Sequence, residues 1–195
     1  MRRSLRAAQW AVLLLGWCGS VQSEEHSKPL LRVGDPAPEF CALDDAGQIW
    51  ESRDHVGREY LVIYFYPGDF SFCCTRQAQR YRDRQKELES LGAKVVGISG
   101  DSVESHRAFK SEHALGFALL SDSVGSIAGL FDVPVRTGSK RAGSDAPQPP
   151  RRVVTLERCT MVIGQDGRIL YRETSISPIH DAGEVIRFLQ TVDGP

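Results

Sequence analysis

The chain has 195 residues, of which 41% are hydrophobic and 25% are charged, which is enough to bury one core of ordinary size. Its formal net charge is −1, and acidic and basic residues are mixed along the sequence. This balance excludes the strongly basic surface that is typical of proteins that bind nucleic acid. A single domain is expected, and its chemistry must come from a local site.

The first 23 residues have the composition of a secretory signal peptide. A basic start over residues 1–6 precedes the apolar stretch Trp10–Trp17, and small and polar residues lead up to Glu24. The apolar stretch is well short of the ~20 residues that a membrane span needs. The sequence therefore predicts a signal peptide at residues 1–23, a domain at residues 24–195, and export to the periplasm or the cell exterior. If the segment is not cleaved, it anchors the domain to a membrane, and lipidation at Cys18 is the weaker alternative because Trp17 is large.

The first half of the domain predicts a hairpin followed by a strand–helix–strand unit. The turn sequence Asp44–Gly47 predicts a small N-terminal β-hairpin. The runs Tyr60–Tyr66 and Val95–Ile98 are rich in β-branched and aromatic residues, which indicates neighbouring central strands that are covered on both faces. Between them, Thr75–Leu91 has the amphipathic pattern of a crossover helix that stops at Gly92.

The second half alternates in the same way. The expected elements are a helix at Ser102–Glu112, a strand at Phe117–Leu120, a short helix at Ser123–Phe131, a hairpin of Cys159–Ile163 with Ile169–Arg172, and a closing helix at Ile179–Val192. This order predicts an α/β fold, a thioredoxin-like mixed sheet flanked by helices. Residues 137–152 have the composition of a flexible loop, with a lid or docking role as the alternative.

The most informative stretch is Pro67–Cys74, which joins the first central strand to the amphipathic helix. This context places Cys74 at a helix N-terminus, where free backbone N–H groups and the helix dipole stabilise a thiolate. Ser71 lies three residues earlier in the same turn. A thiol in this position indicates sulfur chemistry.

The spacing P-x-x-x-S-x-x-C over Pro67–Cys74 resembles the active-site motif of the peroxiredoxins, P-x-x-x-[TS]-x-x-C, at all three fixed positions. The resemblance runs from about Val33 to the C-terminal helix. The segments around Tyr64–Pro67, Gly97–His106 and Leu120–Ser123 are similar to the bacterioferritin-comigratory (PrxQ-type) branch. The run Asp69–Cys74 instead resembles the typical two-cysteine branch.

The resemblance implies a thiol-dependent peroxidase that reduces hydrogen peroxide and organic hydroperoxides. It implies that Cys74 is the peroxidatic nucleophile, that Ser71 donates to the peroxide, and that Pro67 shields the thiolate. Arg158 matches the arginine of a later R-x-[ST]-x-x-[IV] segment, which activates the thiol and holds the substrate oxygens. Thioredoxin or a similar dithiol donor would recycle the enzyme, without cofactor or metal, and a homodimer is left open.

The sequence has no resolving cysteine at the position typical of either branch. A PrxQ-type resolving cysteine would fall at position 79, which is Gln79, and no cysteine follows Cys159. Cys73, Cys41 or an external thiol are the candidates, and a one-cysteine mechanism is the alternative. A buried structural role is favoured for Cys41. Packing is favoured over redox chemistry for Cys73, because a disulfide to its neighbour Cys74 would strain the backbone. Cys159 is expected to be a core residue, because it alternates away from Arg158 on its strand.

Two other functions share the expected fold. An exported thioredoxin-fold disulfide oxidoreductase would need C-x-x-C at the helix start, and a copper-handling module would need C-x-x-x-C with a ligand histidine. Gln77 and Ala78 occupy those second positions. The five histidines show no metal-ligand spacing with the cysteines, so solvated or capping roles are expected for them: His26, His55, His106, His113 and His180.

Overall fold

The computed structural model describes residues 30–138 and 152–192. The expected signal peptide at residues 1–23 and residues 139–151 of the expected loop lie outside the described residues.

A mixed seven-stranded sheet forms the centre of the domain, in the order β2-β1-β5-β4-β3-β8-β9. The strands β3, β4 and β5 run parallel, while β1 pairs antiparallel with β2 and β5, and β8 pairs antiparallel with β3 and β9. This confirms the predicted fold class, the N-terminal hairpin and the pairing of the two central strands. The strands are β1 (Cys41–Asp44), β2 (Ile49–Glu51), β3 (Tyr60–Phe65), β4 (Ala93–Ser99), β5 (Ala118–Ser121), β8 (Cys159–Ile163) and β9 (Ile169–Glu173).

Two hydrophobic clusters cover the two faces of this sheet. Along β3, Leu61, Ile63 and Phe65 enter one cluster, and Val62 and Tyr64 enter the other. Successive strand residues point to opposite faces, so an unbroken apolar run is buried on both sides. Each fully buried side chain of this kind stabilises the fold by about 1.5–3 kcal/mol. The strand before the active-site loop therefore provides a rigid support for it.

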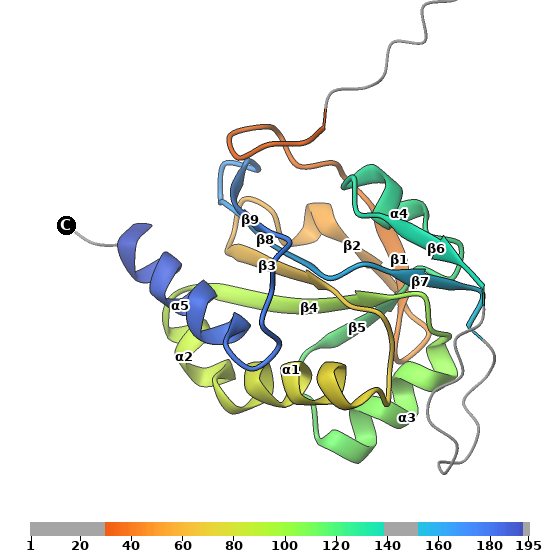
Figure 1. Ribbon diagram of the computed structural model, residues 1–195. Helices are drawn as coiled ribbons and strands as arrows, with labels where there is room; N and C mark the ends of the chain where they lie inside the picture. Colours follow the sequence, from red (N-terminus) through yellow and green to blue (C-terminus); the bar gives the residue numbers. More distant parts are fainter. Residues whose placement is uncertain (1–29, 139–151, 193–195) are drawn as a thin grey trace, which may run out of the picture.

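The helices are divided unequally between the faces (Figure 1). Four helices contribute buried residues to the cluster that contains Tyr64: α1 (Phe72–Asp83), α2 (Gln85–Ser90), α3 (Val103–His113) and α5 (Asp181–Val192). On the other face, α4 (Ser126–Leu130) and the segment with Val154 and Leu156 contribute buried residues. A 3-10 turn, η1 (Ser52–Asp54), follows β2. The side of the sheet with four helices is the side on which Cys74 lies.

The predicted crossover helix Thr75–Leu91 is wrong in its bounds. The helical segment begins at Phe72 and is interrupted at Arg84, where the backbone has φ −110° and ψ 10°. No glycine or proline is present there, so the sequence carries no local signal of the break.

A second sheet of two strands was not predicted. The strands β6 (Val135–Thr137) and β7 (Val154–Leu156) pair antiparallel and flank residues 139–151. Each has three residues, which is too short for the alternation of side chains to stand out in the sequence. The predicted loop 137–152 thus begins on the last residue of β6.

Candidate active site

Cys74 is the third residue of α1 and is almost completely buried, with 1% of its surface exposed. Ser71 occupies the N-cap position in extended conformation, and the first helical hydrogen bond runs from the N–H of Thr75 to the carbonyl of Ser71, 2.8 Å. The N–H groups of the preceding turn therefore have no partner within the helix. This arrangement confirms the predicted position of Cys74 at a helix N-terminus, where a thiolate is favoured.

Arg158 lies immediately before β8 and reaches the sulfur. Its Nη2 donates to Cys74 Sγ at 3.3 Å, and its Nη1 donates to Oε1 of Gln77. The structure thus brings together two residues that are 84 positions apart in the sequence. Because an arginine presents several donors in one plane, it can hold Gln77 with one nitrogen and the sulfur with another.

The contact to Gln77 continues into a buried polar group. Nε2 of Gln77 donates to Oδ2 of Asp181 at 2.6 Å, and the hydroxyls of Tyr81 and Thr160 donate to the same oxygen at 2.8 and 2.9 Å. Gln77, Tyr81, Thr160 and Asp181 are all fully buried. Burial raises the pKa of Asp181, although the three hydrogen bonds act in the opposite direction. Gln77 and Asp181 could not be predicted as site residues from the sequence, because only the fold makes them neighbours.

The loop from Pro67 to Ser71 has an unusual backbone. Phe70 has φ +57°, a left-handed conformation that is rare for a large side chain, and its ring packs edge-to-face on Phe109 at 5.2 Å. The hydroxyl of Ser71 donates to the carbonyl of Gly68 at 3.2 Å and makes no N-cap hydrogen bond. Ser71 therefore stands at the N-cap position, but its hydroxyl does not cap the helix in this structure.

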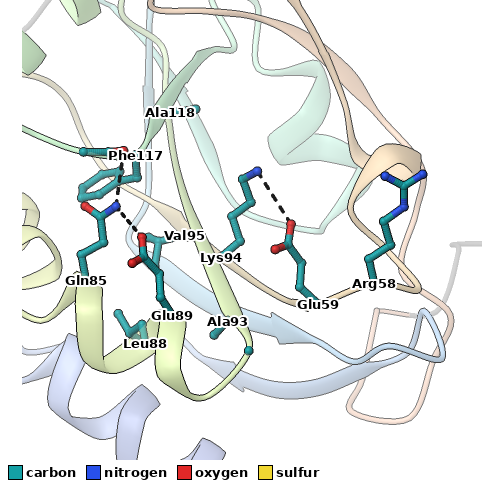
Figure 2. Close-up of a pocket in the computed structure, with 12 residues that line it drawn as sticks. Arg58, Glu59, Gln85, Leu88, Glu89, Ala93, Lys94, Val95, Phe117 and Ala118 are labelled. Carbon is teal, nitrogen blue, oxygen red and sulfur yellow. Dashed lines mark hydrogen bonds and ion pairs between the residues drawn. The ribbon is translucent and has the colours of Figure 1, made fainter.

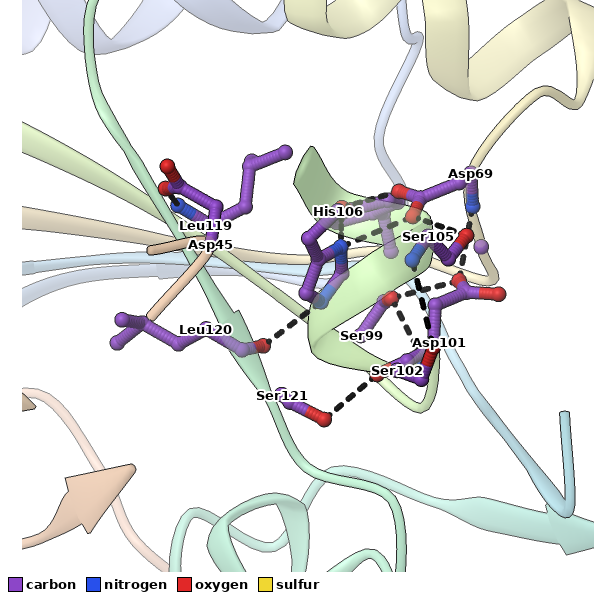
Figure 3. Close-up of polar contacts among 12 residues, drawn as sticks. Asp45, Asp69, Ser99, Asp101, Ser102, Ser105, His106, Leu119, Leu120 and Ser121 are labelled. Atoms are coloured by element: carbon purple, nitrogen blue, oxygen red, sulfur yellow. Dashed lines mark hydrogen bonds and ion pairs between the residues drawn. The ribbon is translucent and has the colours of Figure 1, made fainter. Parts of the chain in front are cut away.

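Asp69 anchors this loop to α3, as Figure 3 shows. Its carboxylate accepts hydrogen bonds from Tyr66 and Ser105, each at 2.8 Å, and lies 2.9 Å from Nδ1 of His106. The other ring nitrogen of His106 faces the carbonyl of Leu120 at 3.2 Å. Both ring nitrogens thus face acceptors, which only the protonated imidazolium satisfies.

The expected solvated or capping role of His106 is wrong, because the side chain is completely buried. Burial by itself disfavours the charged ring, but the hydrogen bond to Asp69 and the charges of Asp69 and Asp101 outweigh it and raise the pKa of His106. The burial of His106 could not be predicted from its place in the first half of α3, since its hydrogen-bond acceptors come from β5 and from the loop after β3.

Arg152 and Asp101 anchor the other end of the loop. Nη1 of Arg152 donates to the carbonyl of Pro67 at 2.5 Å and to Oδ2 of Asp101 at 3.1 Å. Asp101 also accepts from the N–H of Asp69 at 2.8 Å. Burial and the charge of Asp69 raise the pKa of Asp101, while Arg152 lowers it. Pro67 is thus held by a cation that follows residues 139–151.

The other described cysteines are all free thiols, and Cys73 is the neighbour of Cys74 in the first turn of α1. Cys159 is buried in the opposite cluster, which confirms its predicted core role, and burial raises its pKa to about 11. Cys41 and Cys73 are exposed, so the favoured packing roles for both are wrong. Cys41 lies on β1, which β5 and β4 separate from β3.

A groove of about 580 Å³ lies at the opposite end of the sheet (Figure 2). It opens between α2 and the first residues of β4 and β5, and an ion pair of Lys94 with Glu59, 3.7 Å, crosses its rim. None of the residues around Cys74 lines it. Within the described residues, no group of three or more His, Cys, Asp or Glu side chains is placed to hold a metal ion.

The fold and the site define a class of protein: a thioredoxin-like domain with one buried thiol at a helix N-terminus, in contact with an arginine and with no further cysteine after it in that helix. This is the arrangement of a thiol enzyme.

Comparison with known proteins identifies the family. The AhpC/TSA family profile matches residues 33–172. Peroxiredoxin Bcp of Bacillus subtilis (strain 168) is 31% identical over 160 residues, which cover 82% of this chain and 96% of the relative. A putative peroxiredoxin bcp of Coxiella burnetii is 34% identical over 142 residues, covering 71% of this chain and 85% of the relative. The chain belongs to the AhpC/TSA family, and the predicted membership of the peroxiredoxins is confirmed.

Solved structures agree with this assignment. Peroxidoxin BcpB of Mycobacterium tuberculosis superposes with a TM-score of 0.73 at 26% identity, covering 84% of this chain and 99% of the other. A PrxQ variant of Xylella fastidiosa gives 0.70 at 25% identity, covering 85% and 99%. These similarities support the PrxQ-type branch and give no support to the disulfide oxidoreductase or the copper-handling module.

Proposed function

We propose that this peroxiredoxin reduces hydrogen peroxide and organic hydroperoxides through Cys74. The observation that carries the assignment is the contact of 3.3 Å between the Arg158 guanidinium and the sulfur of Cys74 at the N-terminus of α1. The helix N-terminus and the guanidinium both favour the thiolate, which is the nucleophilic form. Among the described cysteines, Cys74 alone combines the helix N-terminus with a contact to a guanidinium.

The reaction begins when the Cys74 thiolate attacks one oxygen of the peroxide. A sulfur–oxygen bond forms, the oxygen–oxygen bond breaks, and the leaving oxygen takes a proton to depart as water or an alcohol. Arg158 stabilises the negative charge on that oxygen, and the hydroxyl of Ser71, in the same turn, donates to it after releasing the carbonyl of Gly68. Pro67 closes the loop over the thiolate. The product on the enzyme is the sulfenic acid of Cys74.

An external thiol resolves this sulfenic acid. Cys159 lies on the other face of the sheet, and Cys41 lies three strand spacings from β3, about 14 Å. Cys73 is adjacent, but neighbouring Cα atoms are ~3.8 Å apart, below the usual disulfide range. The external thiol attacks the sulfenic sulfur and water leaves, and a second thiol reduces the mixed disulfide. Thioredoxin or a similar dithiol donor fits this requirement.

Mass spectrometry after one equivalent of hydrogen peroxide tests the function, with thiol blocking, sulfenic-acid trapping and peptide mapping. We expect a trapped sulfenic acid on Cys74, none in Cys74→Ser, and full reaction in Cys73→Ser. A reactive Cys74→Ser variant together with an inert Cys73→Ser variant would reverse the assignment of the nucleophile. A disulfide between Cys74 and Cys41 in the oxidised protein would contradict resolution by an external thiol.

Location and assembly remain predictions from the sequence. Among the described residues, no helix combines the length and hydropathy required to cross a membrane. Some relatives carry chloroplastic names, such as peroxiredoxin Q of Oryza sativa. We propose export with cleavage near Glu24 from the composition of residues 1–23, and N-terminal sequencing of the mature protein tests it. Light scattering of the purified protein tests the homodimer.

A further inference from the structure

The hydrogen bonds at the reactive sulfur extend past Arg158. Arg158 donates to Oε1 of Gln77, and Nε2 of the same amide donates to Asp181 at 2.6 Å. Gln77 is on α1, one turn after Cys74, and Asp181 is the first residue of α5. A single buried side chain therefore connects the arginine to a carboxylate on a different helix.

The amide of Gln77 can make both hydrogen bonds in only one orientation. A carboxamide has an acceptor end and a donor end, whereas an ionised carboxylate only accepts hydrogen bonds and a guanidinium only donates them. With Asp181 on one side, the NH₂ group of Gln77 must face the carboxylate, so its oxygen must face Arg158. If the amide rotated by half a turn, it would present NH₂ to a cation and leave Arg158 without its acceptor.

Burying the carboxylate of Asp181 costs free energy. It is completely buried, its burial raises its pKa, and its Oδ1 has no hydrogen-bond partner among the described residues. The three donors on Oδ2 and the positive end of the α5 dipole favour the ionised form. Buried carboxylates of this kind contribute little to stability, and some are retained for the specific geometry that they impose.

We propose that Asp181 is a positioning residue for peroxide reduction, because it fixes the amide of Gln77 so that the Arg158 guanidinium is held against the Cys74 sulfur. This inference rests on the proposed function of Cys74. It assigns to the first residue of α5 a role in a reaction that takes place at the first turn of α1.

The variant Asp181→Asn tests the proposal. Asparagine has nearly the same shape, but it can offer either oxygen or NH₂ to Gln77, so the orientation of the amide is no longer imposed. Rapid-quench measurement of Cys74 oxidation by hydrogen peroxide should show a rate constant about tenfold lower than that of the unmodified chain. Asp166→Asn is the matched control, because it makes the same change at an exposed residue of the turn between β8 and β9, and it should stay within about twofold.

An arginine-deficient background separates positioning from a general structural effect. If Asp181 acts through Arg158, Asp181→Asn should add less than about a twofold loss to Arg158→Lys, because these effects are then not additive. An equal loss in both backgrounds, or an unchanged rate in Asp181→Asn alone, would overturn the proposal. If Asp181→Asn does not fold, Gln77→Met breaks the same connection and should give the same non-additive loss. Absence of Cys74 oxidation in the unmodified chain would instead refute the proposed function.

Discussion

At the scale of single residues, the site depends on one guanidinium with two partners. Arg158 contacts both Gln77 and Cys74 with different nitrogens, which uses the planar shape of the group as well as its charge. The sequence motif predicted Cys74, Ser71 and Arg158, because these residues recur at fixed spacing in a known family. It could not predict Gln77 and Asp181, whose roles follow from the packing of α1 against α5.

Arg158→Lys should reduce the rate of Cys74 oxidation by about a hundredfold. Lysine keeps the positive charge, but its single ammonium cannot hold the two partners in the same plane. Stopped-flow measurement against hydrogen peroxide checks this, with Arg136→Lys on the exposed strand β6 as the control that should keep the full rate. A full rate in Arg158→Lys would show that charge alone is sufficient.

The free energy of unfolding should depend on pH through His106, and the direction of this dependence follows from the raised pKa of the ring. Its pKa is raised above the value of about 6.5 expected in the unfolded chain, so its contribution to the free energy of unfolding is complete below that pH and is lost as the pH rises through the folded value. His106→Gln should cost about 3 kcal/mol at about pH 6, because it leaves the buried Asp69 without its charged partner. The cost should be smaller at about pH 8.

Urea unfolding of the unmodified chain and of His106→Gln at both pH values measures this difference. His180→Gln supplies the control, because it changes an exposed side chain and should alter the free energy of unfolding by less than about 0.5 kcal/mol. A cost of His106→Gln that grows with pH would contradict the protonated state that we assign to the ring.

At the scale of elements, the loop between β3 and α1 is held in place by residues of other segments. Asp69 ties it to α3 and Arg152 ties it to the segment before β7, while Phe70 keeps a left-handed backbone against Phe109. The strand and the helix on either side of the loop were predictable from hydrophobic patterning. The anchors were not, because they join residues 37 and 85 positions apart.

Gly68→Ala tests how closely the loop is held. A Cβ at Gly68 would overlap the guanidinium of Arg152, so either that side chain or the loop must move. We expect a loss of about 1–3 kcal/mol in stability and at least a tenfold lower rate of Cys74 oxidation. Gly129→Ala is the control: a Cβ there meets no atom within 4 Å, and alanine in α4 should be neutral or stabilising by up to about 1 kcal/mol.

At the scale of the whole molecule, the fold class, the two hairpins and the pairing of the central strands were predictable, and the assembly of the site was only partly so. The alternation of strands and helices indicated a thioredoxin-like fold, and β3 and β4 pair as expected. The break at Arg84 and the strands β6 and β7 carry no signal in a single sequence, since they depend on how distant segments pack. Exposure was also misjudged where it depended on long-range contacts, as for Cys41, Cys73 and His106.

The placement of Cys74 and Cys159 in clusters on opposite faces of the sheet has a consequence for oxidative damage. The sheet acts as a partition between the two buried thiols, so a wrong crosslink between them would require the central strands to come apart. In an oxidising environment, such a crosslink should therefore form only in unfolded molecules. Non-reducing peptide mapping after oxidation with and without urea would detect it. The crosslink would then mark the molecules that had unfolded during oxidation.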